Sequence, residues 1–187
     1  MKNTKRLAAA LFALALLPTG TATAQAWPTK PIRLMVPFPP GGSTDIVARI
    51  VAQKLSERLG QSMVIENRGG AGGTIGTSAI AKSAPDGYNL AVASTSTHVV
   101  APGVYPKLDY DPVKDFAPIG LMAVSPYLLV VNPAVPAKTL KELVALAKER
   151  PGKLNYASAG VGSTTHLAME MLKAVSGTYM LHIPYNG

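Results

Sequence analysis

The chain has 187 residues, a length typical of one domain or two small ones, and its 48% hydrophobic and 15% charged residues exclude disorder by composition. The net charge is +8, but the basic residues are scattered, which argues against a nucleic-acid surface because such surfaces need clustered charge and interleaved aromatic side chains. Cysteine is absent, so disulfides, thiolate nucleophiles and cysteine-based zinc sites are excluded.

Residues 1–24 are predicted to form a secretory signal peptide. Three basic residues precede an apolar run over 7–17, and Pro18 ends that run. A membrane-spanning helix needs about 20 apolar residues, so the run is too short to be an anchor. Two Ala-x-Ala cleavage patterns follow between residues 22 and 26. We therefore expect a soluble exported protein whose mature chain starts at Gln25 or Trp27.

The remaining chain repeats the order strand, glycine-rich loop, helix. In chain order, apolar periodicity and turn residues predict strand 32–36, a helix over 46–59, strand 63–65, a helix over 74–82, strand 88–93, strand-length apolar runs at 119–124 and 127–131, a helix after Thr139, strand 154–157, a helix up to Gly177 and strand 180–183. This alternation indicates an α/β fold with a largely parallel sheet.

Local signals mark several helix ends. Ser43 or Thr44 is predicted to be the N-cap of the first helix, and Gly60 ends that helix. Thr139 and Glu142 have the spacing of a capping box. At the end of the chain, strand 180–183 leads into a Pro-Tyr-Asn-Gly loop with no helix after it. The unfinished unit suggests that the sequence is a truncated piece of a longer protein.

Two long loops carry the main functional signal. Loops 37–45 and 158–166 each leave a strand, are rich in Gly, Ser and Thr, and open a helix. In doubly wound sheets the ligand crevice lies beyond the carboxyl ends of the strands. The first helical turn there has unpaired N–H groups and a partial positive charge, which favour an anion. We interpret the loops as a cradle for a carboxylate, and the alternative is ordinary helix capping. Nucleotide binding is disfavoured because no phosphate-loop or dinucleotide motif is present.

An enzymatic alternative uses Ser163 as a nucleophile and His166 as its base. Their spacing differs from that of a nucleophile elbow, and no orienting acid is evident. The three histidines, His98, His166 and His182, lack the spacing of a metal site, so we expect no metal and no cofactor.

Some polar and aromatic residues have two interpretations. Asp45 is either a favourable charge in the first helical turn or a partner for a ligand ammonium group. Tyr88, Tyr127 and Tyr156 are expected in the core rather than in a cleft.

Taken in order, the segments resemble the Bug-type receptors, the substrate-binding proteins of tripartite tricarboxylate transporters. The resemblance covers essentially the whole mature chain. The matching segments are AWPTKPI (26–32), VPFPPGGSTD (36–45), VIENRGGAGG (64–73), PDGY (85–88), NYASAGVGSTTHL (155–167) and HIPYNG (182–187).

The resemblance implies a periplasmic solute-binding protein without catalysis, built from two α/β lobes over 25–124 and 125–187 with the ligand cleft between them. It implies a monomer that captures a small organic carboxylate and delivers it transiently to membrane permease subunits, with no nucleic-acid partner. Family members continue beyond residue 187, so the second lobe is expected to be incomplete. A truncated receptor without function is a further alternative.

The resemblance also implies which residues hold the ligand. Most belong to the two loops, and the others end neighbouring strands. They are Phe38, Pro40, Gly41, Gly42, Ser43, Thr44, Asp45, Ser94, Thr95, Ser158, Ala159, Gly160, Gly162, Ser163, Thr164, His166 and Tyr185.

Overall fold

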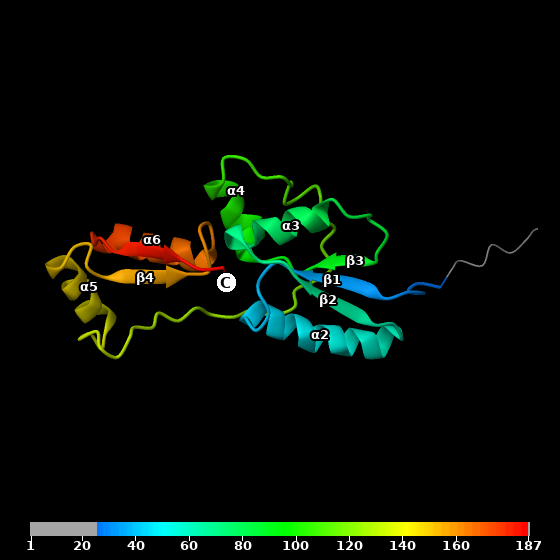
Figure 1. Cartoon of the computed structure of the whole chain (residues 1–187), viewed down its shortest axis with the longest axis horizontal. Coiled ribbons are helices and arrows are strands. Elements are labelled where there is room, and N and C mark those ends of the chain that lie inside the picture. Colours follow the sequence, from blue (N-terminus) through cyan, green and yellow to red (C-terminus); the bar gives the residue numbers. More distant parts are fainter. Residues whose placement is uncertain (1–25, 187) are drawn as a thin grey trace, which may run out of the picture.

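The computed structural model describes residues 26–186, so the predicted signal peptide and Gly187 lie outside the described residues. It contains two parallel sheets, one three-stranded in the order β2-β1-β3 and one two-stranded, β4-β5 (Figure 1). The strands are β1 (Ile32–Val36), β2 (Met63–Asn67), β3 (Asn89–Ala91), β4 (Asn155–Ser158) and β5 (Leu181–Pro184). The α/β architecture with parallel strands agrees with the prediction.

Helices follow the strands in the predicted order. They are α2 (Ser43–Leu59), α3 (Thr74–Ala81), α5 (Leu140–Glu149) and α6 (Thr164–Ser176). The short 3₁₀ turn η1 (Ala71–Gly73), the π-helical turn η2 (Ser96–Val100) and the short helix α4 (Ala101–Val104) were not predicted from the sequence. Gly60 and Gly177 end α2 and α6 in the left-handed conformation, as glycine does most easily. The predicted capping box of α5 is present, since the N–H groups of Glu142 and Thr139 donate to the side chains of Thr139 and Glu142.

Each sheet has its own small core. In the first sheet, Leu34 and Val36 of β1 pack against Ala48 and Ala52, two small residues that let α2 approach closely. In the second sheet, Tyr156 packs with Ala147 of α5 and Met180 before β5. The two cores are separate, so each sheet and its helices bury their own apolar faces.

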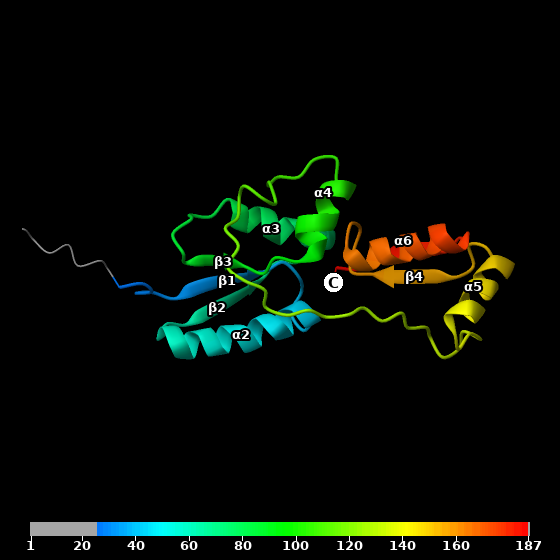
Figure 2. The ribbon, with the colours of Figure 1, turned by 180° about the vertical axis from the view of Figure 1, so that it is seen from behind.

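The carboxyl ends of the two sheets point toward the same junction. Two opposite views agree that the loop after β1 and the loop after β4 both lie on this side (Figures 1 and 2). Residues 117–139 connect the two sheets as a long segment outside regular structure. Within residues 26–186, none of the helices combines the length and apolarity that a membrane crossing needs.

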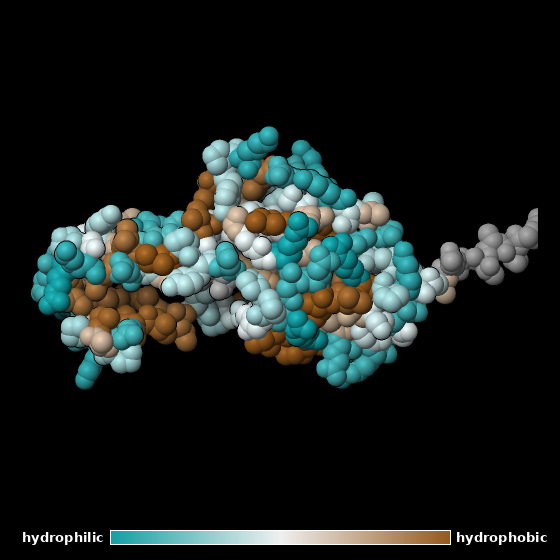
Figure 3. Space-filling view, viewed as in Figure 1, coloured by the Kyte–Doolittle hydropathy of each residue, from teal (hydrophilic) through white to brown (hydrophobic). Residues whose placement is uncertain are grey.

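The structure corrects three predictions. Residues 119–124 and 127–131 are not strands, because no other backbone within residues 26–186 pairs with them, and most of their apolar side chains are exposed. Exposed apolar areas are visible on both halves of the molecule (Figure 3).

The N-cap of α2 is Gly42 rather than Ser43 or Thr44, because both of those residues lie inside the first helical turn. Tyr127 is 65% exposed rather than part of the core, and Tyr88 is half-buried and lines a pocket instead of the core.

The capping box provides a test of the second sheet's local stability. Thr139→Ala removes the acceptor for the Glu142 N–H and should lower the free energy of unfolding by about 0.5–2 kcal/mol. Lys141→Ala, at an exposed position of the same turn, is the matched control and should change it by less than about 0.5 kcal/mol. Urea unfolding of both variants measures the difference, and equal stabilities would contradict a stabilising role for the box.

Candidate functional site

A buried carboxylate holds loop 37–45 in shape. Asp45 is 2% exposed. Its oxygens accept from the N–H of Gly41 at 2.9 Å, from Nδ2 of Asn67 at 2.9 Å and from Nε of Arg49 at 2.8 Å. The Arg49 guanidinium, followed by the Gly41 N–H, holds the pKa of Asp45 well below its usual range. With both oxygens occupied, Asp45 organises the loop rather than pairing with a ligand ammonium group.

The outer part of the same loop is open. Gly41 has a φ of +88°, and Gly41, Gly42 and Ser43 are exposed, while Thr44 is half-buried. The first hydrogen bond of α2 runs from the Ile46 N–H to the Gly42 carbonyl at 3.0 Å. The preceding N–H groups therefore have no carbonyl partner within the helix. They form a concentration of donors at the positive end of α2, where an anion is favoured.

Loop 158–166 is packed more tightly. Ser163 is 1% exposed and acts as the N-cap of α6, with Oγ accepting from the His166 N–H at 3.2 Å and contacting Thr165 Oγ1 at 3.0 Å. The Ala159 N–H donates to Thr165 Oγ1 at 3.0 Å. Gly162 adopts a φ of +75°, and a Cβ there would lie 2.6 Å from the ring of Tyr105. The Ser163 hydroxyl, which was expected to hold the ligand, is thus hydrogen-bonded within its own loop.

Contacts at the junction join loop 158–166 to segments that precede the second sheet in the chain. Ser96 Oγ accepts from the Thr164 N–H at 3.0 Å and lies 3.0 Å from Thr164 Oγ1. Tyr105 donates to the Val161 carbonyl at 2.7 Å, and the Tyr127 hydroxyl lies 2.7 Å from Thr164 Oγ1. The structure therefore places Thr164 between two hydroxyl groups, those of Ser96 and Tyr127, that come from different segments.

The glycine-rich loop 67–73 also meets loop 158–166. A Cβ on Gly72 would lie 2.8 Å from the Val161 carbonyl oxygen, so only glycine allows this approach. Sequence reasoning found the glycines of loop 67–73 but did not connect them with loop 158–166. It also missed Ser96, Tyr105 and Tyr127. The one available signal was the run of hydroxyl residues after β3.

The remaining predicted site residues lie around this junction. Phe38 packs beside Gly73, and Pro40 is exposed. Ser94 bonds to Thr97 within its own turn, and Thr95 is exposed before η2. Tyr185 is exposed, and its N–H donates to the Ser158 carbonyl at 3.0 Å.

Ser163 and His166 are not arranged as a nucleophile and its base. Ser163 Oγ accepts from the backbone N–H of His166, while the His166 ring accepts from the Gly162 N–H through Nδ1 at 3.4 Å. A buried hydroxyl that caps a helix has no access to a substrate. The geometry therefore favours capping over catalysis for this pair.

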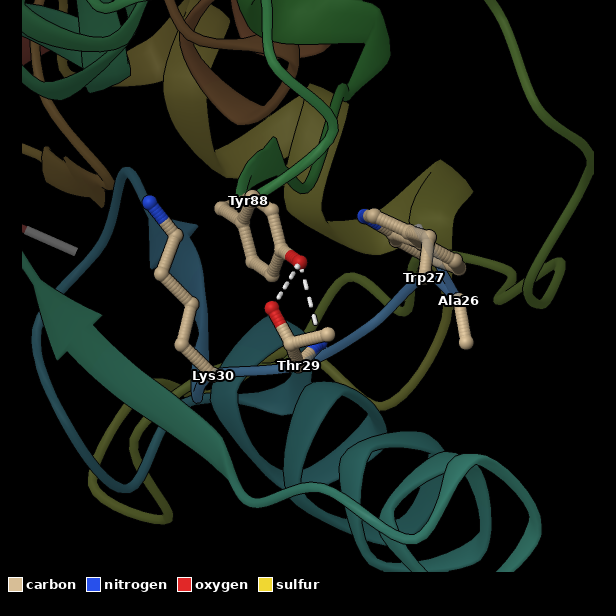
Figure 4. Close-up of a pocket in the computed structure, with 5 residues that line it drawn as sticks. All are labelled: Ala26, Trp27, Thr29, Lys30 and Tyr88. Carbon is tan, nitrogen blue, oxygen red and sulfur yellow. Dashed lines mark hydrogen bonds between the residues drawn. The ribbon is translucent and has the colours of Figure 1, made fainter. Parts of the chain in front are cut away.

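A pocket of about 390 Å³ lies away from these loops. It is lined by Ala26, Trp27, Thr29, Lys30 and Tyr88 (Figure 4). The Tyr88 hydroxyl accepts from the Thr29 N–H at 2.9 Å, and Lys30 Nζ lies 4.3 Å from the centre of the Tyr88 ring. These residues precede β1 and β3, so the pocket lies at the end of the sheet opposite to loop 37–45. Among residues 26–186, no three His, Asp or Glu side chains gather as a metal site would require.

Comparison with known proteins identifies one family and several curated relatives. Residues 47–187 match the family described as tripartite tricarboxylate transporter family receptor. Protein BugT of Bordetella pertussis is 42% identical over 166 residues, which cover 88% of this chain and 51% of BugT. The chain spans about half the length of the curated relatives it matches.

Solved structures show the same fold. An R. palustris protein with adipate is 40% identical, with a TM-score of 0.84 over 87% of this chain and 54% of that chain. The periplasmic binding protein BugD is 38% identical, with a TM-score of 0.76 over 86% of this chain and 54% of that chain. The predicted α/β fold of the periplasmic-binding-protein type is thereby confirmed.

Asp45 offers a direct test of how loop 37–45 is held. Asp45→Asn should lower the free energy of unfolding at pH 7 by about 2–4 kcal/mol, because it weakens charge-assisted bonds to Gly41 and Arg49. The control Glu57→Gln, which removes an exposed ion pair with Lys54 on the same helix, should cost less than about 1 kcal/mol.

The stabilising effect of Asp45 on the free energy of unfolding should depend on pH. The folded-state pKa of Asp45 is depressed, so its contribution is present above the unfolded pKa of about 3.9 and is lost as pH falls below it. Urea unfolding from pH 7 to pH 3 should show the difference between wild type and Asp45→Asn shrinking in the acid range. A difference that stays constant over this range would contradict the ionised carboxylate as the source of the stability.

Proposed function

The chain belongs to the family of tripartite tricarboxylate transporter receptors, and on this premise we propose that it is a solute-binding receptor for a small organic carboxylate. The observation that carries the proposal is the open N-terminus of α2, where Gly42, Ser43 and Thr44 present donors that no carbonyl of the helix satisfies. A relative of known structure holds the dicarboxylate adipate, which has the ligand chemistry that such donors suit.

Neutral donors fit a carboxylate better than a phosphate. A carboxylate carries one charge over two oxygens, and N–H and hydroxyl groups can bind it without a neighbouring cation. In loop 37–45 we assign this role to the N–H groups of Gly42, Ser43 and Thr44 and to the two hydroxyls. Asp45 contributes indirectly, because its bond to the Gly41 N–H keeps the turn in place.

The second contact is proposed at Thr164. Its N–H and hydroxyl now bond to Ser96 of η2, which precedes the second sheet. A carboxylate oxygen between the two residues would accept from both hydroxyls and from the Thr164 N–H. The Tyr127 hydroxyl, 2.7 Å from Thr164 Oγ1, would complete this set of donors. Ser158, Gly160 and Ser163 support the loop from within.

The cellular role follows from the family. We propose that residues 1–24 direct export to the periplasm, and that residues 25–124 and 125–187 contribute to two lobes that close on the ligand. The proposed partners are the carboxylate and the permease subunits of the transporter, which the receptor contacts as a monomer. An exported hydrolase is less well supported, because the Ser163 hydroxyl caps a helix.

Gly42 allows the cradle to be blocked without straining the fold. Its φ is −75°, and an added Cβ would meet only the Pro39 carbonyl at 3.8 Å. Gly42→Val should weaken adipate binding at least tenfold by covering donors that contribute about 1.5–3 kcal/mol each. Isothermal titration calorimetry measures the affinity.

The matched control is Gly103→Val, which also places a valine in open space. It should leave adipate affinity unchanged. Thermal melts of both variants should confirm that each is folded. Equal adipate affinities for wild type and Gly42→Val would refute the assignment of loop 37–45. Absence of binding across a panel of mono-, di- and tricarboxylates that includes adipate would refute the proposed function.

A further inference from the structure

Three aromatic rings stack directly behind loop 158–166. The His182 ring lies between the rings of Tyr156 and His166, with centroid distances of 4.8 Å and 4.2 Å and interplanar angles of 16° and 19°. These rings come from β5, β4 and α6, so the stack packs the three elements against one another where loop 158–166 begins and ends. Sequence reasoning treated the histidines only as poor metal ligands and did not bring His166 and His182 together.

Both imidazoles are bonded to the loop. His182 Nε2 lies 2.6 Å from Ser158 Oγ, and this hydroxyl also accepts from the Gly160 N–H at 3.1 Å. His166 Nδ1 accepts from the Gly162 N–H at 3.4 Å. Gly162, with a φ of +75°, thus bonds directly to the His166 ring, and Gly160, with a φ of +107°, is linked to the His182 ring through Ser158.

The hydrogen bond that His166 Nδ1 accepts determines which nitrogen of the neutral ring carries the proton. A ring that accepts at Nδ1 carries its proton on Nε2, and Nε2 lies 4.0 Å from a carboxylate oxygen of Glu170. A second proton would have to sit on Nδ1, where it would oppose the Gly162 N–H. Charging both rings would also place two cations 4.2 Å apart.

The other ionisable groups facing the pair are Tyr156, Glu170 and Lys173. Glu170 accepts from the Tyr156 hydroxyl and from Lys173 Nζ, the latter at 2.7 Å. These bonds, with Lys173 first, lower the pKa of Glu170, so it stays ionised and its charge is already shared between two donors. Burial raises the pKa of Tyr156, which keeps its hydroxyl protonated.

We propose that His166 and His182 are positioning residues that hold loop 158–166 in its ligand-binding shape while both rings are neutral, and that acidification loosens the loop and weakens carboxylate binding. This inference rests on the proposed function, because it concerns the second half of the same site. It adds a proton-sensitive element to a site whose proposed ligand contacts do not titrate near neutral pH.

The sign of the effect follows from the ring environment. Burial, followed by the proximity of His166, holds the pKa of His182 below its ordinary value. The native loop therefore binds fewer protons than the loosened one, so its stability is complete above about pH 6.5 and declines as pH falls. Ligand affinity should decline in the same range.

The test compares two substitutions of His182 by calorimetry with adipate between pH 7.5 and pH 5.5. Wild-type affinity should fall at least tenfold over this range. His182→Gln keeps a side-chain partner for Ser158 without a titrating ring, so its loss of affinity should be at most half as large on a logarithmic scale. His182→Phe keeps the stack but loses the Ser158 contact, so it should bind weakly at every pH. His98→Gln, which changes the histidine of η2 outside the ring stack, corrects for protonation of adipate itself and should follow wild type.

A second readout needs no ligand. In the unliganded chain, NMR titration should show the amide signals of Gly160 and Gly162 shifting together with the ring signals of His182. Rings that titrate without moving these amides, or a His182→Gln profile equal to wild type, would overturn the inference. Amides that shift while adipate does not bind would leave the histidine support standing and refute the carboxylate site instead.

Discussion

The proposed site depends on the hydrogen bonds that the buried carboxylate of Asp45 accepts. The carboxylate bonds to the N–H of Gly41, to Asn67 at the end of β2 and to Arg49 one turn along α2. One side chain thereby fixes the loop, the neighbouring strand and the helix relative to one another. An anion placed at the N-terminus of α2 would otherwise meet this negative charge. The bonds from Arg49 and Gly41 compensate it locally, so the outer N–H groups remain attractive to an anion.

The two loops at the junction are supported by different chemistry. Loop 37–45 depends on an ion pair that is insensitive to pH near neutrality. Loop 158–166 depends on hydroxyls and on the stacked rings of His166 and His182, and burial holds the pKa of His182 below its ordinary value. Thr164 links the second loop to Ser96 across the junction. A ligand held by both loops would couple a rigid contact to one that responds to protons.

Local features of this fold could be predicted from the sequence, and long-range contacts could not. The capping box at Thr139, the stop at Gly60 and the strand before loop 37–45 depend on residues a few positions apart, so their patterns are readable. The contacts Ser96–Thr164 and His166–His182 join segments that only the fold brings together. The apolar run 119–131 misled the prediction because a strand needs a paired neighbour as well as apolar side chains. Loops 37–45 and 158–166 were identified correctly as segments that open helices. The sequence could not show that the Asp45 carboxylate and the Ser163 hydroxyl form hydrogen bonds within their own loops, because those bonds depend on packing.

The central claim is that a carboxylate binds at the N-terminus of α2 and at Thr164. Its most direct test is an NMR titration of the isotopically labelled chain with adipate, followed through the backbone amides. If the carboxylate binds there, the largest shifts should occur at Gly42, Ser43, Thr44 and Thr164. Shifts confined to the pocket around Trp27, Lys30 and Tyr88, with loop 37–45 unchanged, would contradict it.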